Sequence, residues 1–185
     1  MRFLGMFDSL SLRIDSYITN TNMPWDKSKD QVLLSVGVLE AWIQNKKGAE
    51  EYSYERLWHK SFKSQAICIH WNDEMNIIAA GCDNGSLVLL SFNPSSPLKY
   101  KEIYNEKVHK GRIMAIFLDQ TRNMVFTIGE DKYLRCTDIK LRETMSSCKV
   151  SDTKLTCMKV DPDNLVGFIS DRKGCIHVYD LLNVR

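Results

Sequence analysis

The sequence predicts an all-β fold of about four similar units, each a small four-stranded antiparallel sheet. Runs of four to six residues rich in Ile, Val, Leu, Phe and Tyr recur along the chain, and such runs are typical of half-buried or buried strands. Turn residues separate them: Asp83-Asn84-Gly85, for example, tolerates the positive φ of a tight hairpin. The pattern repeats with a spacing of 42–48 residues.

Three segments align with one another from their first strand to their last. Their first strands begin at Ala66, Ile113 and Leu155, which gives offsets of 47 and 42 residues. A period of this length, with several strands and a hairpin turn, is typical of β-propeller blades. The alternative is a β-sandwich in which the similarity is coincidental. The aligned hairpin turns are predicted to be Gly81-Cys82-Asp83, Gly129-Glu130-Asp131 and Ser170-Asp171-Arg172.

A weaker fourth copy lies upstream. Residues 32–36 and 38–43 would flank a turn shortened to about Gly37, and an outer strand is expected near 52–58 after a polar connection over 44–51. We therefore expect an N-terminal segment followed by a region of blades over 31–185. The expected blade bounds are 31–62, 63–106, 107–149 and 150–185.

The N-terminal segment, residues 1–30, allows two interpretations. Its apolar residues recur at helical spacing, which predicts a short helix. Alternatively, residues 2–7 could supply the outer strand of the last blade, as ring-closing strands do in propellers. Residues 19–30 have the composition of a loop. The residues at helical spacing are Phe3, Met6, Phe7, Leu10 and Ile14.

The composition favours a core-forming chain and argues against two classes of protein. Of the 185 residues, 44% are hydrophobic and 26% are charged, unlike a disordered chain. The 25 basic and 23 acidic residues leave a net charge of +2, so we expect no nucleic acid as a partner. No stretch approaches the roughly 18 apolar residues of a membrane span, so we expect no direct membrane insertion.

The cysteine pattern predicts a reduced, cytoplasmic protein without a metal. None of the six cysteines forms a C-x-x-C pair, the central element of zinc-ribbon and thioredoxin-type motifs. The apolar run 3–7 stops at Asp8, well short of a secretory signal. We interpret the cysteines as mostly buried small hydrophobes. A disulfide framework is the alternative.

The pattern G-x-D, followed by an apolar strand ending in W-D, resembles the WD40 repeat. It is carried here by Gly81-Cys82-Asp83, Gly129-Glu130-Asp131, Thr137-Asp138 and Tyr179-Asp180. In that family a His, a Ser or Thr, the turn Asp and the Trp form a hydrogen-bonded tetrad. The resemblance implies such a cluster at His109, Thr127 and Asp131, incomplete because Thr137 replaces the Trp. It also implies structural turn roles for Asp83, Asp138 and Asp180, with Arg172 in place of the last turn Asp.

At a finer level, residues 31–184 look like the N-terminal blades of the WD-repeat and FYVE-domain-containing proteins. The similar stretches are AAGCDNG at 79–85, the run 111–132 and FISD at 168–171. That family joins a seven-bladed propeller to a cysteine-rich zinc module that binds phosphatidylinositol 3-phosphate on endosomes. This sequence contains no such module, so the resemblance implies neither zinc nor lipid binding for these residues.

Motifs of catalysis are absent from the sequence. It has no G-x-x-x-x-G-K-[ST] or G-x-G-x-x-G phosphate loop, no G-x-S-x-G and no H-E-x-x-H. The four histidines are scattered, and no nucleophile has a neighbouring base. We expect no enzyme, no catalytic residue and no cofactor.

One face can be predicted from the topology of a blade. The loop before the inner strand and the hairpin between the second and third strands emerge at the same end. That face is either a solvated rim of mixed charge or a docking surface for an acidic or extended partner segment. Its candidate residues are Lys107, Lys110, Arg112, Glu130, Lys132, Arg172 and Lys173.

The leading functional hypothesis is a non-catalytic protein–protein interaction scaffold. Four blades make a fragment or a half-ring, to be completed by further blades or by another chain. Its open strand edges predict that the isolated chain associates. One alternative is an endosomal membrane-trafficking adaptor whose lipid-binding zinc module lies outside this chain. Another is a structural subunit of a large assembly. The predicted location is the cytoplasm, either free or peripheral to endosomes.

Overall fold

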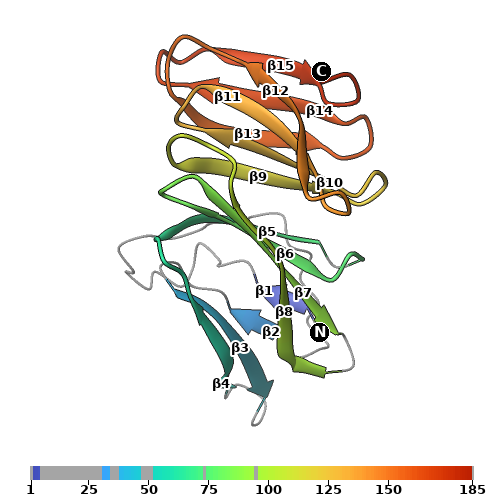
Figure 1. Ribbon diagram of the computed structural model, residues 1–185. Coiled ribbons are helices and arrows are strands. Elements are labelled where there is room, and N and C mark those ends of the chain that lie inside the picture. Colours follow the sequence, from blue (N-terminus) through green and yellow to red (C-terminus); the bar gives the residue numbers. More distant parts are fainter. Residues whose placement is uncertain are drawn as a thin grey trace.

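Four β-sheets follow one another along the chain and stack in sequence order (Figure 1). The computed structural model describes residues 2–4, 31–33, 38–46, 52–72, 74–93 and 96–184. Every regular element in these ranges is a strand. The all-β fold of repeated sheets predicted from the sequence is therefore confirmed.

The first sheet has the strand order β1-β2-β3-β4. Its last three strands form an antiparallel meander where the weak upstream copy was predicted. The predicted turn at Gly37 lies outside the described residues, as does most of the 44–51 connection. The strands are β1 (Arg2–Leu4), β2 (Gln31–Leu33), β3 (Val38–Lys46) and β4 (Tyr52–Ser61).

The N-terminal strand β1 corrects both predictions for residues 2–4. These residues are extended, not helical, and they pair in parallel with β2 of the first sheet instead of joining the last one. The free edge of β2 offers unpaired backbone N–H and C=O groups, which an extended segment can satisfy. The remaining residues of the predicted helix and of the 19–30 loop lie outside the described part of the chain.

The second and third sheets are antiparallel meanders of four strands each. The three predicted strands of each repeat are confirmed, and the looser stretch after them forms the outer strand. The second sheet contains β5 (Ala66–Asn72), β6 (Ile77–Cys82), β7 (Ser86–Asn93) and β8 (Ser96–Lys107). The third contains β9 (Ile113–Asp119), β10 (Met124–Gly129), β11 (Tyr133–Asp138) and β12 (Glu143–Lys149).

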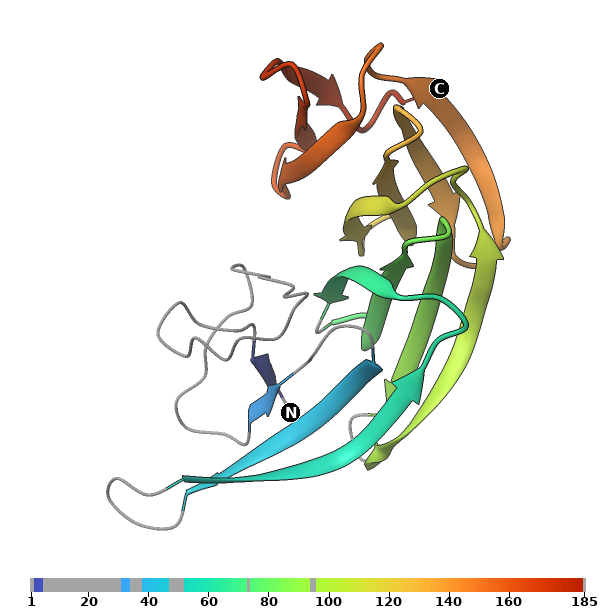
Figure 2. The ribbon, with the colours of Figure 1, turned by 90° about the vertical axis from the view of Figure 1, so that its left-hand side faces the viewer.

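The fourth sheet has three strands in the described residues, whereas the other sheets have four each. These strands are β13 (Leu155–Asp161), β14 (Val166–Asp171) and β15 (Ile176–Asp180). In Figure 2 the sheets fan out as an arc, with β4, β8 and β12 along its convex side and β5, β9 and β13 turned toward the opposite side. The outer position beside β15 is empty among the described strands.

The hairpin turns correct the predicted alignment by one residue. The backbone N–H groups of Asp83, Glu130 and Arg172 make the same bond, each to the carbonyl of the residue before the inner strand, at 2.9, 2.8 and 3.0 Å. The left-handed residues that follow are also equivalent: Gly85, Lys132 and Gly174, at φ 88°, 78° and 80°.

The offsets of 47 and 42 residues therefore hold through the turns. Asn84, not Asp83, corresponds to Asp131, and Lys173, not Arg172, takes that place in the fourth sheet. The predicted alignment matched Gly81 with Gly129 by residue type. The backbone instead makes Cys82 equivalent to Gly129. In the second sheet Ala66 pairs with Cys82, and in the third sheet Ile113 pairs with Gly129 in the same way.

Apolar side chains fill the spaces between successive sheets. Ala79, Leu87 and Leu89 of the second sheet form one core with Ile113 and Leu118 of the third. The interface between the third and fourth sheets is built in the same way. Its core includes Phe126, Leu134 and Cys136 from one side and Leu155, Met158 and Ile169 from the other.

Polar links also cross these interfaces. His70 Nδ1 accepts a hydrogen bond from the Leu118 amide at 3.3 Å, which joins β5 to β9. Burial lowers the pKa of His70 to about 4, so the ring is neutral and able to accept. Between the third and fourth sheets, Arg122 binds Asp119 at 2.6 Å and donates to the Leu181 carbonyl at 3.2 Å.

Candidate functional site

A buried polar cluster holds the loop that enters the third sheet. His109, on this loop, is 2% exposed. Its Nε2 lies 2.9 Å from Thr127 Oγ1 on β10, and its Nδ1 lies 2.8 Å from Asp131 Oδ1 in the hairpin turn. Asp131 also accepts from the Lys110 amide at 3.0 Å. The structure thus brings together three residues that the resemblance singled out.

His109 Nδ1 lies between a donor and an acceptor. A guanidinium nitrogen of Arg135 approaches it at 2.5 Å and can only donate, whereas Asp131 Oδ1 at 2.8 Å can only accept. Burial lowers the pKa of His109 although Asp131 acts in the opposite direction. Burial alone would raise the pKa of Asp131. Hydrogen bonds from His109, the Lys110 amide and Arg135 outweigh that effect and lower it.

Arg135 is the member of this cluster that the sequence did not suggest. Its guanidinium donates to Asp131 Oδ2 at 2.7 Å and stacks over Tyr133, 5.0 Å from the ring centroid. It compensates the buried carboxylate, as a buried charge requires. The sequence feature that could have identified Arg135 is its charge, because it stands between the apolar residues Leu134 and Cys136 of a predicted strand. Thr137, at the expected Trp position, contacts Thr144 at 3.4 Å and not the cluster.

The second sheet has apolar residues at most of the corresponding positions. Phe62 stands in place of His109, and it packs against a core cluster that contains Ala80, Cys82 and Val88. These three correspond to Thr127, Gly129 and Arg135. Asp83 accepts a hydrogen bond from the Ser64 hydroxyl, so it has a turn role as expected, but at a different position in the turn.

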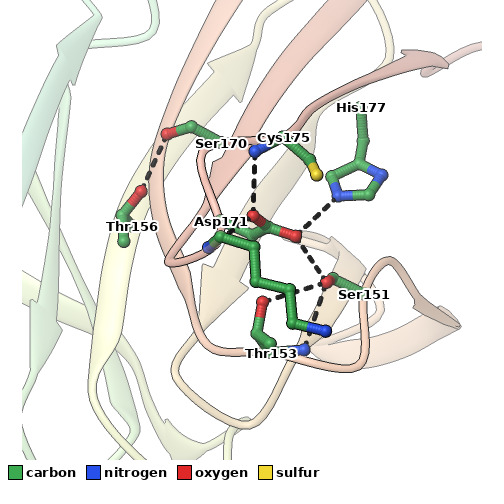
Figure 3. Close-up of polar contacts among 8 residues, drawn as sticks. Ser151, Thr153, Thr156, Ser170, Asp171, Cys175 and His177 are labelled. Atoms are coloured by element: carbon green, nitrogen blue, oxygen red, sulfur yellow. Dashed lines mark hydrogen bonds and ion pairs between the residues drawn. The ribbon is translucent and has the colours of Figure 1, made fainter.

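The fourth sheet has a different polar cluster, centred on Asp171 (Figure 3). Ser151 replaces His109, and its hydroxyl donates to Asp171 Oδ2 at 2.6 Å. His177 Nε2 lies 3.0 Å from the same oxygen. The amides of Lys173 and Cys175 donate to Asp171 Oδ1 at 2.9 and 3.1 Å. Hydrogen bonds from His177 and Ser151 lower the pKa of this carboxyl group.

The two clusters are alternative ways to fill one space. Asp171 corresponds to Gly129, and a Cβ atom at Gly129 would lie 2.3 Å from His109 Nδ1. The long histidine in the loop therefore requires glycine at the end of β10. Where the loop carries the short Ser151, the end of β14 can carry an aspartate instead. His177 then occupies the position of Arg135.

The last two predicted turn residues lie at the other end of the sheets. Asp138 Oδ1 accepts from the amides of Lys140 and Leu141 at 2.7 and 2.8 Å. Asp180 Oδ1 accepts from the Leu182 amide at 2.9 Å. Each carboxylate closes the turn that follows its strand, which agrees with the structural role implied by the resemblance.

The loops held by these clusters form a rim, and the predicted basic residues lie on it. Inner-strand loops and hairpin turns bond to each other there, as the Glu130 amide does to the Arg112 carbonyl. Glu130 is flanked by Lys154 at 3.1 Å and Arg172 at 3.8 Å. We call the following set the basic rim: Lys107, Lys110, Arg112, Lys132, Lys154, Arg172 and Lys173.

The charges of the rim are unequally compensated. Lys107, Lys110, Arg112 and Lys173 are exposed, and Lys132 is half-buried. The acidic groups are partly engaged: Asp131 binds Arg135, and Asp152 binds Lys149 at 2.5 Å. The hydrogen bond from Lys149 lowers the pKa of Asp152, and the charges of Lys132 and Lys173 act in the same direction.

Two kinds of feature are absent from the part of the chain that the structure describes. No three His, Cys, Asp or Glu side chains there gather as metal ligands. No helix in these ranges is long and apolar enough to cross a membrane.

Comparison with solved structures defines the class of fold. No protein-family model and no curated protein matches the sequence. Sqt1 from Chaetomium thermophilum, bound to the N-terminus of ribosomal protein L10, superposes with a TM-score of 0.64 over 82% of this chain at 16% identity. The WD40 β-propeller domain of Doa1 gives 0.58 over 80% at 12% identity. The computationally designed protein Ika4 gives 0.58 over 84% at 14% identity.

The chain therefore has a β-propeller fold, similar to that of the Doa1 domain, and the alternative of a β-sandwich is wrong. It spans 47% of the Sqt1 chain and 48% of the Doa1 chain, about half of each. It spans 93% of Ika4.

Proposed function

We propose that this chain is a non-catalytic protein–protein interaction scaffold whose basic rim docks an acidic segment of a partner protein. The observation that carries the proposal is that seven basic residues lie on or beside the inner-strand loops and hairpin turns at one end of three successive sheets, two of them bound to Glu130. Side chains of one sign on neighbouring loops raise the local concentration of an oppositely charged ligand and its association rate.

The rim is well suited to recognition because its loops are held in place. Asp131 fixes the loop of Lys110, and Asp171 fixes the turn that carries Lys173. The Val108 and His109 amides both donate to the Gly85 carbonyl at 3.0 Å. Side chains on a fixed backbone lose less conformational entropy on binding than those on a mobile loop.

The comparison with Sqt1 supports a protein segment as the ligand. In that structure a propeller of this fold is bound to the N-terminus of ribosomal protein L10. For the present chain the ligand would be acidic, because the charges of the rim are basic.

We also propose that the arc is completed by further blades, from the same polypeptide or from another chain. The support is that the chain spans about half of the Sqt1 and Doa1 structures. The endosomal adaptor, the subunit of a large assembly and the cytoplasmic location stay predictions from the sequence. The adaptor additionally needs a zinc module, and the described residues hold no group of metal ligands.

Charge reversal at the rim tests the docking proposal. The quadruple variant Lys110→Glu, Arg112→Glu, Arg172→Glu, Lys173→Glu should lose binding to a fluorescent acidic peptide of twelve residues by at least about tenfold at low salt. A matched control reverses four exposed charges away from the rim: Lys99→Glu, Lys101→Glu, Lys140→Glu and Arg142→Glu.

The control variant should bind the acidic peptide like the unmodified chain, and a basic peptide of the same length should not bind the unmodified chain. Equal loss of binding in both quadruple variants would show that net charge and not the rim is responsible. Affinity purification with the same two variants, followed by quantitative mass spectrometry, should then show partners that depend on the rim alone. A partner set unchanged in the rim variant would contradict the proposal.

A further inference from the structure

The outward face of the fourth sheet carries large apolar side chains in contact with water. Phe168 on β14 is 46% exposed, and Ile176 and Val178 on β15 are 70% and 62% exposed. The ladder pairs Phe168 with Val178 and Ser170 with Ile176, so the three side chains share one face of the sheet. Exposed apolar groups gathered in this way mark an interaction site on a soluble protein.

The same three positions are core positions in the preceding sheets. The offsets of 42 and 47 residues place each exposed residue in line with a residue that is at most 7% exposed. These buried counterparts are Phe126, Leu134 and Cys136 in the third sheet, and Ala79, Leu87 and Leu89 in the second.

In both earlier cases the next sheet covers the apolar set with its inner strand. Ile113 and Ile116 on β9 pack on the set of the second sheet, and Leu155 and Met158 on β13 pack on that of the third. The covering strand thus presents apolar residues at positions i and i+3. The fourth sheet has no such cover among the described residues.

The edge of β15 is also open. The corresponding strands β7 and β11 pair along that edge with the outer strands β8 and β12. Within the described ranges β15 pairs with β14 only. The backbone N–H and C=O groups along this edge need hydrogen-bond partners, and the apolar face beside it needs a cover that excludes water.

We propose that this terminal face, made of Phe168, Ile176, Val178 and the open edge of β15, docks a further β-propeller blade. An extended peptide could pair with the edge, but it would leave the apolar face in water. A blade preceded by an outer strand satisfies both, as the two interfaces inside this chain do. The occupant is therefore defined by its chemistry: an edge-pairing strand, then an inner strand with apolar residues at i and i+3.

This inference deepens the proposed completion of the arc. It uses none of the basic rim residues, so the experiment below and the rim experiment fail independently.

A blade taken from the chain itself is the probe. The offset of 42 residues means that a second copy of residues 143–184, joined directly after Val184, continues the repeat in register. Its first seven residues copy β12 and should pair with β15. Its copy of β13 should then bring Leu and Met onto Phe168, Ile176 and Val178.

Two cysteines report on docking. Cys157 and Cys175 are both exposed. In the second sheet Cys68, which corresponds to Cys157, is buried, whereas Ser86, which corresponds to Cys175, is half-buried. The third-sheet counterparts, Ala115 and Tyr133, are both half-buried. In the extended chain, alkylation of Cys157 by iodoacetamide should slow by about tenfold or more relative to Cys175, and the amides of β15 should exchange more slowly.

The control carries Ile176→Lys and Val178→Lys. Because both side chains are exposed, the double variant of the unextended chain should melt like the unmodified chain, whereas Leu134→Lys should unfold it. In the extended chain the same double variant should restore fast alkylation of Cys157. Equal alkylation rates with and without the lysines would overturn the proposal. So would a specific dimer of the unextended chain that the lysines dissolve, since the face would then belong to a second copy.

Discussion

In the third sheet His109 reaches into the structure to meet Thr127 and Asp131, whereas in the fourth sheet Ser151 occupies the same position and is too short to do so. The fourth sheet compensates with Asp171, which fills the space that Gly129 leaves free for the histidine. In both sheets the carboxylate also contacts a side chain of the next strand. Arg135 binds Asp131, and the imidazole of His177 contacts Asp171.

The two sheets therefore hold segments of the rim with different residues, each through a carboxylate that accepts backbone hydrogen bonds. Both carboxylates fix a rim loop or turn: Asp131 accepts from the Lys110 amide and Asp171 from the Lys173 amide. The second sheet fills much of the same space with the apolar Phe62 and Cys82. Space filling and satisfied polar groups decide which residues are compatible.

The largest effect is expected at the glycine of the third sheet. Gly129→Ala would place a methyl group against His109 Nδ1 and Asp131 Oδ1, both closer than 3.0 Å, and would lower the free energy of unfolding by about 3 kcal/mol. Denaturant unfolding measures it. Gly111→Ala is the matched control, because its Cβ would meet nothing closer than 3.5 Å and the loss should be well under 1 kcal/mol.

Removal of the central carboxylate of the fourth sheet should come next. Asp171→Ala leaves the donors of Ser151, His177 and two backbone amides without their acceptor, which should cost about 2–3 kcal/mol. The exposed Asp163 supplies the comparison: Asp163→Ala should change stability by less than about 0.5 kcal/mol. Similar losses in the two variants would show that the Asp171 cluster is not a unit.

The interface around His70 and the Asp171 cluster should differ in their response to acid. Burial lowers the pKa of His70 to about 4, so the unfolded chain binds a proton below about pH 6.5 that the folded chain does not. The stability of the interface between the second and third sheets is thus full above pH 6.5 and falls, on the order of 2 kcal/mol, as the pH drops toward 4. His109, whose pKa is also lowered, adds to this fall.

The Asp171 cluster should respond at lower pH, because the pKa of this carboxyl group is lowered on folding. Its contribution is present above the pKa of an unfolded aspartate, about 3.9, and is lost below it. Melting temperatures between pH 7 and 4 test the prediction for His70: His70→Asn, whose side-chain oxygen can still accept from the Leu118 amide, should flatten the decline. An identical slope in His70→Asn would contradict the assignment.

A smaller effect of the opposite sign is expected in the turns. Lys132 adopts the left-handed φ of 78° where the other two sheets have Gly85 and Gly174. Lys132→Gly should relieve this strain and stabilise the chain by about 0.5–1 kcal/mol. The reverse exchange, Gly174→Lys, has open space for the side chain and should cost a similar amount, so the two variants together isolate the backbone term.

How much of this was predictable depends on what each residue reports. The strand runs and the offsets of 47 and 42 residues predicted the sheets, because alternation and turn residues are local signals. His109, Thr127 and Asp131 were predicted only through the resemblance to WD40 repeats. The sequence did not predict the cluster of Ser151, Asp171 and His177. These side chains meet because the loop of the fourth sheet has no histidine, and Asp171 fills the space that a histidine would occupy.

The one-residue error in the turns has the same origin. Matching Gly81 with Gly129 follows residue type, whereas the backbone keeps Cys82 and Gly129 equivalent through a bulge in the inner ladder. The parallel pairing of β1 with β2 could not be predicted either, because it depends on a free edge that exists only in the folded sheet.

The direct test of this account is a double-mutant cycle between the two positions that the sheets exchange. Gly129→Asp alone should destabilise the chain strongly, because the carboxylate meets His109, and His109→Ser alone should lose the bonds to Thr127 and Asp131. Together they recreate the pair Ser151 and Asp171, so the double variant should be more stable than the sum of the single losses by about 2 kcal/mol or more. Additive losses, within about 0.5 kcal/mol, would contradict the claim that the two clusters are alternative solutions for one space.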